Sequence, residues 1–279
     1  MLEILNGNLP KKESGLQAAF TTPGTYYWTV PAGVTSISAV AVGGGGGSWD
    51  RTKPISETWG SPGIGGMLRY KVSIAVTPGE VLTIEVGAAG TNTTAIGYAG
   101  AGGNSLIRRG TTVLLRAMGG RAGGATGQST VSPNTTGGIG DGGGNGGTVV
   151  YWYQNSSGGS GAGGYSGNGG AGGGAEWGGG DGAGGAPGGG FGDIRSGANP
   201  GRGGRGGGVG IFGIGNNGAG AKSAFNTNGG DGSQYDGSGA FGGGASLPSS
   251  GRAPINALGG AVRIVWGAGR NYPNYVPDV

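Results

Sequence analysis

Glycine recurs at every third position through much of residues 137–244, and this period constrains the fold more than any other feature of the sequence. The longest unbroken series is Gly158, Gly161, Gly164, Gly167, Gly170 and Gly173. An α-helix repeats about every 3.6 residues and a strand about every 2, whereas a polyproline-II-type helix has about 3 residues per turn. A glycine on each turn leaves one edge of such a helix flat, so a neighbouring backbone can pack against it.

Three structures are compatible with such a composition. The stretch can be a flexible linker, a collagen, or a bundle of polyglycine-II helices joined by N–H···O and Cα–H···O contacts. Collagen is disfavoured, because its strict Gly-X-Y frame and abundant proline contrast with a frame that slips at Glu176 and a chain with only 13 Pro. Ordering glycine loses more backbone entropy than ordering any other residue, so a bundle needs support from the flanking sequence.

The flanking sequence is typical of strands bounded by turns. The predicted strands are residues 25–30, 35–42, 68–76 and 81–86, a hairpin of 105–108 with 112–116, and residues 260–267 near the end. A single terminal strand cannot bury itself, so it must pair with strands before residue 120. The glycine stretch therefore begins and ends at one sheet, which favours a folded bundle over a linker.

Residues 68–76 show the clearest alternation and predict a half-buried strand. The predicted inward side chains are Leu68, Tyr70, Val72, Ile74 and Val76. Residues 81–86 follow a turn at 77–80 and are predicted to be the antiparallel partner of that strand, with Leu82, Ile84 and Val86 inward.

Composition argues against an enzyme. The chain has no His and no Cys, which removes the usual general base near neutral pH, the thiol nucleophile and the commonest metal ligands. Asp181 and Asp193 could form a glycosidase pair, but acidic residues among glycines are ordinary turn formers. We expect no catalytic residue, no cofactor and no metal site.

Charge and hydropathy limit the partners. The net charge is +4 with scattered Lys and Arg, which disfavours nucleic acid; the Arg-Gly pairs at residues 201–206 are weak evidence for RNA. No segment is apolar enough to span a bilayer and residues 1–19 lack a signal-peptide core. We expect a protein made in the cytoplasm, without membrane insertion.

Large aromatic side chains are the main chemistry left for a contact surface. Apolar segments at 148–153 and 209–212 and single aromatic residues interrupt the glycine stretch, unlike flexible linkers. The candidate contact residues are Trp49, Trp59, Tyr151, Trp152, Tyr153, Trp177, Phe191, Phe225, Tyr235 and Phe241. Exposed aromatic residues are favoured anchors at interfaces; the alternative is that these rings pack between glycine layers, against the sheets or within an oligomer.

Four motifs stand out along the chain: Val-Pro-Ala-Gly-Val-Thr at 30–35, Val-Ala-Val and five glycines at 40–47, Val-Thr-Pro-Gly-Glu at 76–80, and Gly-Gly-Ala-Val-Arg-Ile-Val-Trp-Gly at 259–267. Together they resemble the glycine-rich domain of bacteriophage tail and virion structural proteins. The resemblance implies an all-β fold, a small jelly-roll-like β-sandwich with an inserted bundle of polyglycine-II helices. The chain is more loosely similar to the tail-fibre adhesins of T-even-type phages, and to the glycine-rich domain of a receptor tyrosine kinase ectodomain, which contains cysteines.

The expected organisation has three parts. Residues 1–19 form an N-terminal attachment arm, residues 20–120 with 255–279 the β-sandwich, and residues 121–254 the glycine-rich insertion. The expected function is that of a virion protein of the tail fibre, tail tip or baseplate, located on the phage particle. The arm and sandwich would bind other virion proteins, and the bundle would present aromatic loops to a host receptor. We expect a homo-oligomer, a trimer by analogy with fibres.

Two other roles fit the same sequence. One is a structural or decoration protein of the capsid or baseplate without a receptor. The other is a bacterial surface or matrix protein, which the lack of a signal peptide disfavours. An RNA-binding Arg-Gly protein would instead require a disordered glycine stretch and salt-sensitive binding.

Overall fold

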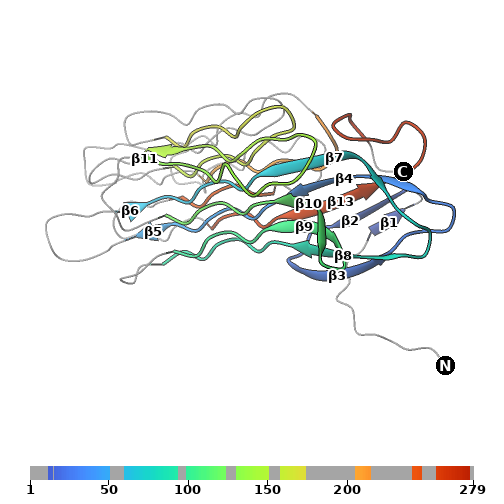
Figure 1. Ribbon diagram of the computed structural model, residues 1–279. Helices are drawn as coiled ribbons and strands as arrows, with labels where there is room; N and C mark the ends of the chain where they lie inside the picture. The colour runs from blue at the N-terminus through green and yellow to red at the C-terminus, as the bar shows by residue number, and fades with distance from the viewer. Residues whose placement is uncertain are drawn as a thin grey trace, which may run out of the picture.

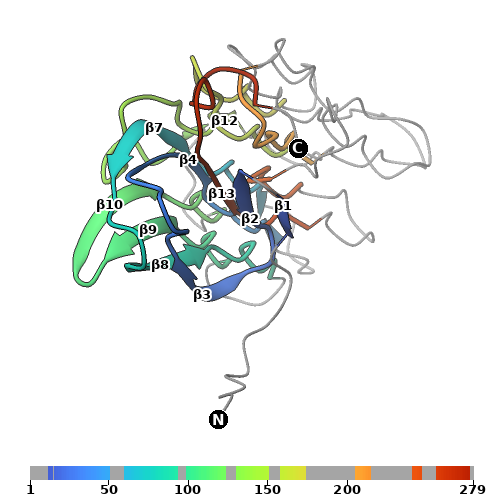
Figure 2. The same cartoon turned by 90° about the vertical axis from the view of Figure 1, so that its right-hand side faces the viewer.

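The computed structural model describes residues 12–14, 16–50, 60–93, 99–123, 130–150, 158–173, 205–214, 241–246 and 256–276. Within these ranges the protein is all-β, without helices. Two antiparallel sheets pack together as two layers, seen from the end in Figure 2. Long described segments without regular strands leave one end of the two layers (Figure 1).

The larger sheet has five strands in the order β1-β2-β13-β4-β7. Their bounds are Lys12–Ser14, Gln17–Phe20, Ala261–Val265, Ser36–Val42 and Leu68–Ala75. The smaller sheet has four strands in the order β10-β9-β8-β3, with bounds Thr112–Ala117, Ser105–Arg109, Val81–Val86 and Gly24–Thr29. Two short pairs complete the described strands, β5 (Trp49–Asp50) with β6 (Gly60–Ser61) and β11 (Thr130–Val131) with β12 (Val149–Val150).

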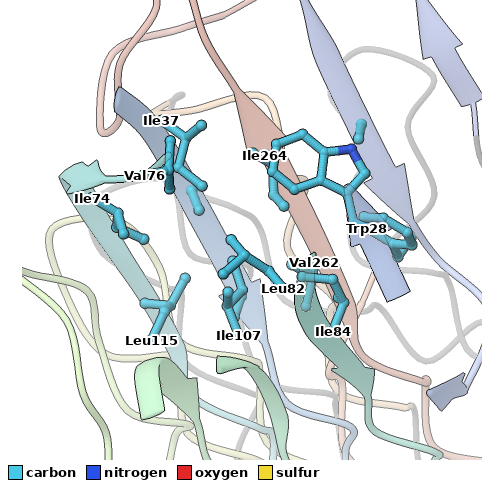
Figure 3. Packing of buried hydrophobic residues seen from close by; sticks show 14 of the residues in the cluster. Trp28, Ile37, Ile74, Val76, Leu82, Ile84, Ile107, Leu115, Val262 and Ile264 are labelled. Atoms are coloured by element: carbon cyan, nitrogen blue, oxygen red, sulfur yellow. The ribbon is translucent and has the colours of Figure 1, made fainter. Parts of the chain in front are cut away.

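The apolar side chains that the sequence places on alternate positions meet between the two sheets (Figure 3). The smaller sheet contributes Trp28, Leu82, Ile84, Ile107 and Leu115, and the larger sheet contributes Ile37, Ile74, Val262 and Ile264. Trp28 also packs against Trp266, with ring centroids 5.5 Å apart. As predicted, the terminal strand β13 pairs with strands before residue 120, with β2 on one side and β4 on the other.

The predicted pairing of residues 68–76 with residues 81–86 is wrong, because these strands lie in different sheets. β7 pairs with β4, and β8 pairs with β3 and β9. The turn at 77–80 crosses between the layers, beside a second crossing at 30–35: Val30 N–H donates to Glu80 O and Val76 N–H to Thr35 O. The turn therefore joins two layers and does not close a hairpin.

The prediction of one common inward face for residues 68–76 is also wrong. Ile74 and Val76 lie in the core between the sheets, whereas Leu68 and Tyr70 pack on the opposite face of the larger sheet. Val72 is 41% exposed. Where β4 advances two residues, from Ile37 to Ala39, its partner β7 moves by three, from Ile74 to Lys71. The extra residue is a bulge in β7, and it puts the side chains on its two sides on opposite faces.

Glycine-rich rows continue the strands at one end of the sandwich (Figure 1). Residues 43–48, 87–93 and 118–123 follow β4, β8 and β10, while residues 61–67, 99–104 and 256–260 lead into β7, β9 and β13. Further rows join them at 142–148, 158–164, 167–173, 205–209 and 241–246. We call these rows together the glycine bundle.

Residues 43–48 lie in the middle of the glycine bundle. Successive N–H groups of residues 43–47 donate in turn to three different rows, and the direction repeats after three residues. The acceptors are, in chain order, the carbonyl oxygens of Met67, Gly103, Leu258, Ile64 and Gly100. The carbonyl groups of residues 44–48 accept in the same way from three other rows, through the N–H groups of Gly120, Gly90, Ala245, Gly123 and Thr93.

The bundle has no room for side chains along this central row. A Cβ built on any of residues 43–47 would lie far inside 3.0 Å of a main-chain carbonyl of another row. All five glycines are buried. Since side chains no longer separate the two sheets, their continuations bond directly to each other; Gly44, which follows β4, donates to Gly103, which precedes β9.

The hairpin of residues 158–173 uses the glycine period observed in the sequence. Gly158, Gly161 and Gly164 donate to Gly173, Gly170 and Gly167, at 2.9 Å each. The residues directly before Gly161 and Gly164 bond to another row, since the N–H groups of Ser160 and Gly163 donate to the carbonyl oxygens of residues 63 and 66. Every third glycine therefore lies on the same edge of its row.

Candidate functional site

The glycine bundle has a sandwich end and a far end. Rows that follow a strand run outward, from the sandwich to the far end. Rows that precede a strand run inward, from the far end to the sandwich. Antiparallel bonding to these rows gives the direction of the others: residues 142–148, 167–173 and 241–246 run outward, and 158–164 and 205–209 run inward.

Most connections between the described rows therefore start and finish at the far end. An outward row precedes and an inward row follows the connections at 51–59, 94–98, 151–157, 174–204 and 247–255. Residues 215–240 differ, because their flanks lie at the sandwich end. Ile214 N–H donates to Pro273 O, and Phe241 packs in a cluster with Val42.

Two of the ten aromatic candidates lie among the described residues, and both are buried. Trp49 is 4% exposed at the far end, where β5 pairs with β6 and bridges to Thr93. Phe241 is 9% exposed at the sandwich end and exchanges two main-chain hydrogen bonds with Val209. Their rings pack within the chain, the alternative considered from the sequence, and offer little surface to a partner.

The other eight candidates lie outside the described residues: Trp59, Tyr151, Trp152, Tyr153, Trp177, Phe191, Phe225 and Tyr235. Their flanks separate them into two groups. The first six belong to stretches whose described flanks lie at the far end, and Phe225 and Tyr235 to the stretch flanked at the sandwich end. The far end is therefore the candidate contact site.

A second core covers the outer face of the larger sheet, and sequence reasoning missed it. Its buried residues are Val40, Val42, Leu68, Ala162, Tyr165, Val209, Ile211, Phe241, Ala261, Val265, Tyr272 and Val276. They join strands β4, β7 and β13 to three glycine rows and to the C-terminal segment. Tyr165 stacks on Tyr272, with ring centroids 6.0 Å apart and planes at 12°. This core attaches part of the bundle to the sandwich.

Arg263 is the polar centre of the second core. Its side chain is fully buried, donates to Gln17 Oε1 and to the carbonyl oxygen of Val276 at 2.7 Å, and lies 4.3 Å from the ring centre of Phe212. Tyr272 Oη donates to Ile211 O at 2.6 Å. The sequence signal was available, because Arg263 interrupts a strand that is apolar on both faces, as expected for a buried and hydrogen-bonded charge.

Three acidic residues, Glu80, Glu85 and Asp141, have structural partners. Arg109 forms a two-bond ion pair with Glu80 at 2.8 and 2.9 Å, and this hydrogen bonding lowers the pKa of the Glu80 carboxyl. Arg108 pairs with Glu85 at 2.9 Å, and Asp141 accepts from Val72 N–H. Within the described ranges, no three metal-ligating side chains gather. Asp181 and Asp193 lie outside those ranges.

Arg69 ties the sandwich to the glycine bundle. Its guanidinium donates to Gly144 O at 2.8 Å and to Asn145 Oδ1 at 2.7 Å, both in the row next to β7. Burial lowers the pKa of Arg69. The contact fixes an outer row against the end of β7.

An open cleft of about 750 Å³ lies at the end of the sandwich away from the bundle. It lies between the crossing at 31–38 and the C-terminal turn at 266–271, with Leu16 and Val72 at its wall. Leu16 is 40% exposed and precedes β2. The molecule therefore has a concave, partly apolar surface at the opposite end from the candidate contact site.

A family model described as a glycine-rich domain matches residues 21–253. This span includes most of the sandwich and nearly all the rows of the bundle. The chain belongs to the glycine-rich domain family. In this glycine-rich domain, the family match begins just before β3 and ends before the row that leads into β13. The search of curated proteins finds no significant match.

The part of the glycine-rich domain that the structure describes has no helix long and apolar enough to cross a membrane.

Proposed function

We propose that the protein is a bacteriophage virion structural protein, of the tail fibre, tail tip or baseplate, that presents a rigid glycine-rich domain to a host receptor. The observation that carries the proposal is the division of the molecule into two ends. At one end of the molecule lies the sandwich, with a compact core and an open cleft. The described flanks of most connections between rows lie at the far end, among them the flanks of the stretches that contain Trp59, residues 151–153, Trp177 and Phe191.

We infer that the glycine rows are polyglycine-II helices inserted in a jelly-roll-like sandwich. In a β-strand, which repeats every two residues, N–H groups alternate between two directions in one plane. In a helix with about three residues per turn they point in three directions, and residues 43–47 donate in three directions in turn. Dense bonding between such rows would give a stiff, narrow spacer that holds far-end loops away from the particle.

The proposed partners follow from the same arrangement. Other virion proteins would bind the N-terminal arm and the sandwich, and several copies on one particle would raise the avidity of weak receptor contacts. The alternative is a decoration or structural protein of the capsid or baseplate, or a bacterial surface or matrix protein. A role without a receptor is favoured by the burial of Trp49 and Phe241, the two described contact candidates, because buried rings offer little surface to a receptor.

The test is binding of the fluorescently labelled protein to whole cells across a panel of bacteria, with competition by unlabelled protein. We expect saturable binding that is lost when residues 151–153 are replaced together by Ser. The matched control is Tyr275→Ser at the sandwich end, where Tyr275 is 57% exposed. Binding to no strain, or binding that both variants retain, would contradict the adhesin role and favour a decoration protein.

A further inference from the structure

Among the described residues, the two large sheets have four edge strands, and three of these are covered by another segment or are very short. At the edge of β10, Arg116 and Ile139 exchange main-chain hydrogen bonds of 2.9 and 2.8 Å. At the edge of β7, Tyr70 N–H donates to Gly142 O and Asp141 N–H to Tyr70 O. β1, at the third edge, is only three residues long, and a short edge strand offers little to pair with.

β3 forms the fourth edge and has no such protection. Among the described residues it pairs only with β8, over six residues from Gly24 to Thr29. It contains no charged residue and no proline, the side chains that usually keep edge strands from pairing. In Figure 2, no coloured segment lies beyond β3 at that rim of the smaller sheet.

The free main-chain groups of β3 can be assigned. Val30 bonds on the β8 side, since its N–H donates to Glu80 O and its carbonyl accepts from Gly79 N–H. Because successive residues of a strand direct these groups to alternate sides, those of Thr25, Tyr27 and Thr29 face the open side. The side chain of Tyr27 is 75% exposed and lies at the middle of this set.

We propose that β3 is the interface of a two-fold dimer, in which the β3 strands of two copies of this chain pair antiparallel. Centred on Tyr27, the pairing places Tyr27 opposite Tyr27 of the second copy and each Thr25 opposite a Thr29. About six main-chain hydrogen bonds form, and the outward side chains make aromatic and Thr–Thr cross-strand pairs, which are favourable.

A second copy is the occupant that fits this edge. It supplies an uncharged strand of equal length and twist, and antiparallel pairing continues the direction of the existing sheet. The nearest charges on the outer face, Glu85 and Arg108, neutralise each other at 2.9 Å, so two identical faces meet without like-charge repulsion. The inference does not depend on receptor attachment, and it favours two-fold symmetry over the trimer expected by analogy with fibres.

The test uses the absence of native cysteine. In the dimer, the Cα atoms of a hydrogen-bonded pair lie about 5.5 Å apart, within reach of a disulfide. Tyr27→Cys should therefore cross-link two copies under mild oxidation. Val81→Cys is the matched control, because Val81 is 53% exposed on the adjacent strand β8 but away from the edge; it should cross-link little.

Sedimentation equilibrium gives an independent measurement. We expect a reversible dimer, and Tyr27→Lys should raise the dissociation constant at least about tenfold, because two like charges would lie opposite each other. Val81→Lys should leave it unchanged. A wild-type monomer from micromolar to millimolar concentration, a trimer, or equal cross-linking of both cysteine variants would overturn the proposal.

Discussion

Gly45→Ala tests whether direct backbone packing holds the glycine bundle together. A Cβ at this position would overlap the carbonyl group of Gly243, which belongs to another row. Gly45 also donates to Leu258 O and accepts from Gly90 N–H, both at 2.8 Å. The row at 241–246 can relieve the overlap only by moving, which strains hydrogen bonds on both sides of it.

The expected loss is about 4 kcal/mol. Overpacking costs about 1–3 kcal/mol, and weakening two hydrogen bonds adds about 0.5–1.5 kcal/mol each. At about 2.1 cal/mol/K of unfolding entropy per residue, 279 residues give about 0.6 kcal/mol/K. The Tm should therefore fall by about 7 °C in differential scanning calorimetry.

Gly259→Ala is the matched control in the same bundle. Its Cβ would meet only Pro23 Cγ at 3.7 Å and Gly87 O at 3.9 Å, which are ordinary contacts. Alanine also reduces the entropy of the unfolded chain, so we expect a change of at most about 1 kcal/mol, in the stabilising direction. Equal Tm values for Gly45→Ala and the wild type would refute close packing of the rows.

Three further substitutions, with Arg108→Met as a control, test the sandwich and the second core. Arg263→Met should lower the free energy of unfolding by about 3–5 kcal/mol in urea denaturation, since it leaves buried acceptors unpaired; Arg108→Met, at a half-exposed ion pair, should change it by less than about 1 kcal/mol. Tyr272→Phe should cost about 1–2 kcal/mol in the same assay through its lost hydrogen bond. The pKa of Glu80 is lowered in the folded state, so its contribution is present above its unfolded pKa and disappears as the pH falls through the folded pKa. Glu80→Gln should therefore flatten the acid side of the stability–pH curve by less than about 1 kcal/mol.

The strands could be predicted from the sequence because their signals are local. Alternation and turn residues located β3, β4, β7, β8, β9 and β10 to within about two residues. The pairing of β13 with earlier strands followed from the need of a single strand for partners. These predictions needed only the chain's own pattern and elementary burial.

The arrangement of those strands could not be predicted in the same way. A turn of the type at 77–80 is compatible with a hairpin and with a crossing between layers, and only the packing of both sheets selects the second. The bulge in β7 between Lys71 and Ile74 has no residue signature, yet it decides which face Leu68 occupies. Alternation along residues 260–267 sets Arg263 opposite Val262 and Ile264, but only the fold shows that the C-terminal segment covers the face of Arg263.

The glycine period is visible in the hydrogen bonds of residues 158–173, and rows of the same kind also occur outside the glycine stretch. The unbroken series in residues 158–173 bonds to itself at every third residue, as a three-residue turn requires. The predicted insertion covered residues 121–254, whereas hydrogen-bonded rows also occur at 43–48, 61–67, 87–93 and 99–104. A short glycine run between strong strand signals looks like the end of a strand, because a row of five residues is too short to display a period.

The position of the central row explains how so much glycine can be ordered. Ordering a glycine costs more backbone entropy than ordering any other residue. An isolated row would lose this entropy without gaining hydrogen bonds, because its partners are other rows. Six rows of the bundle are instead covalent continuations of sandwich strands, so folding the sandwich core already holds their first residues close together. Each further residue then adds hydrogen bonds to rows whose ends are aligned, much as helix propagation follows nucleation. We therefore expect the sandwich to act as the nucleus of the bundle, so that a substitution in its core, such as Trp28→Ala, destabilises the glycine rows as well as the two sheets.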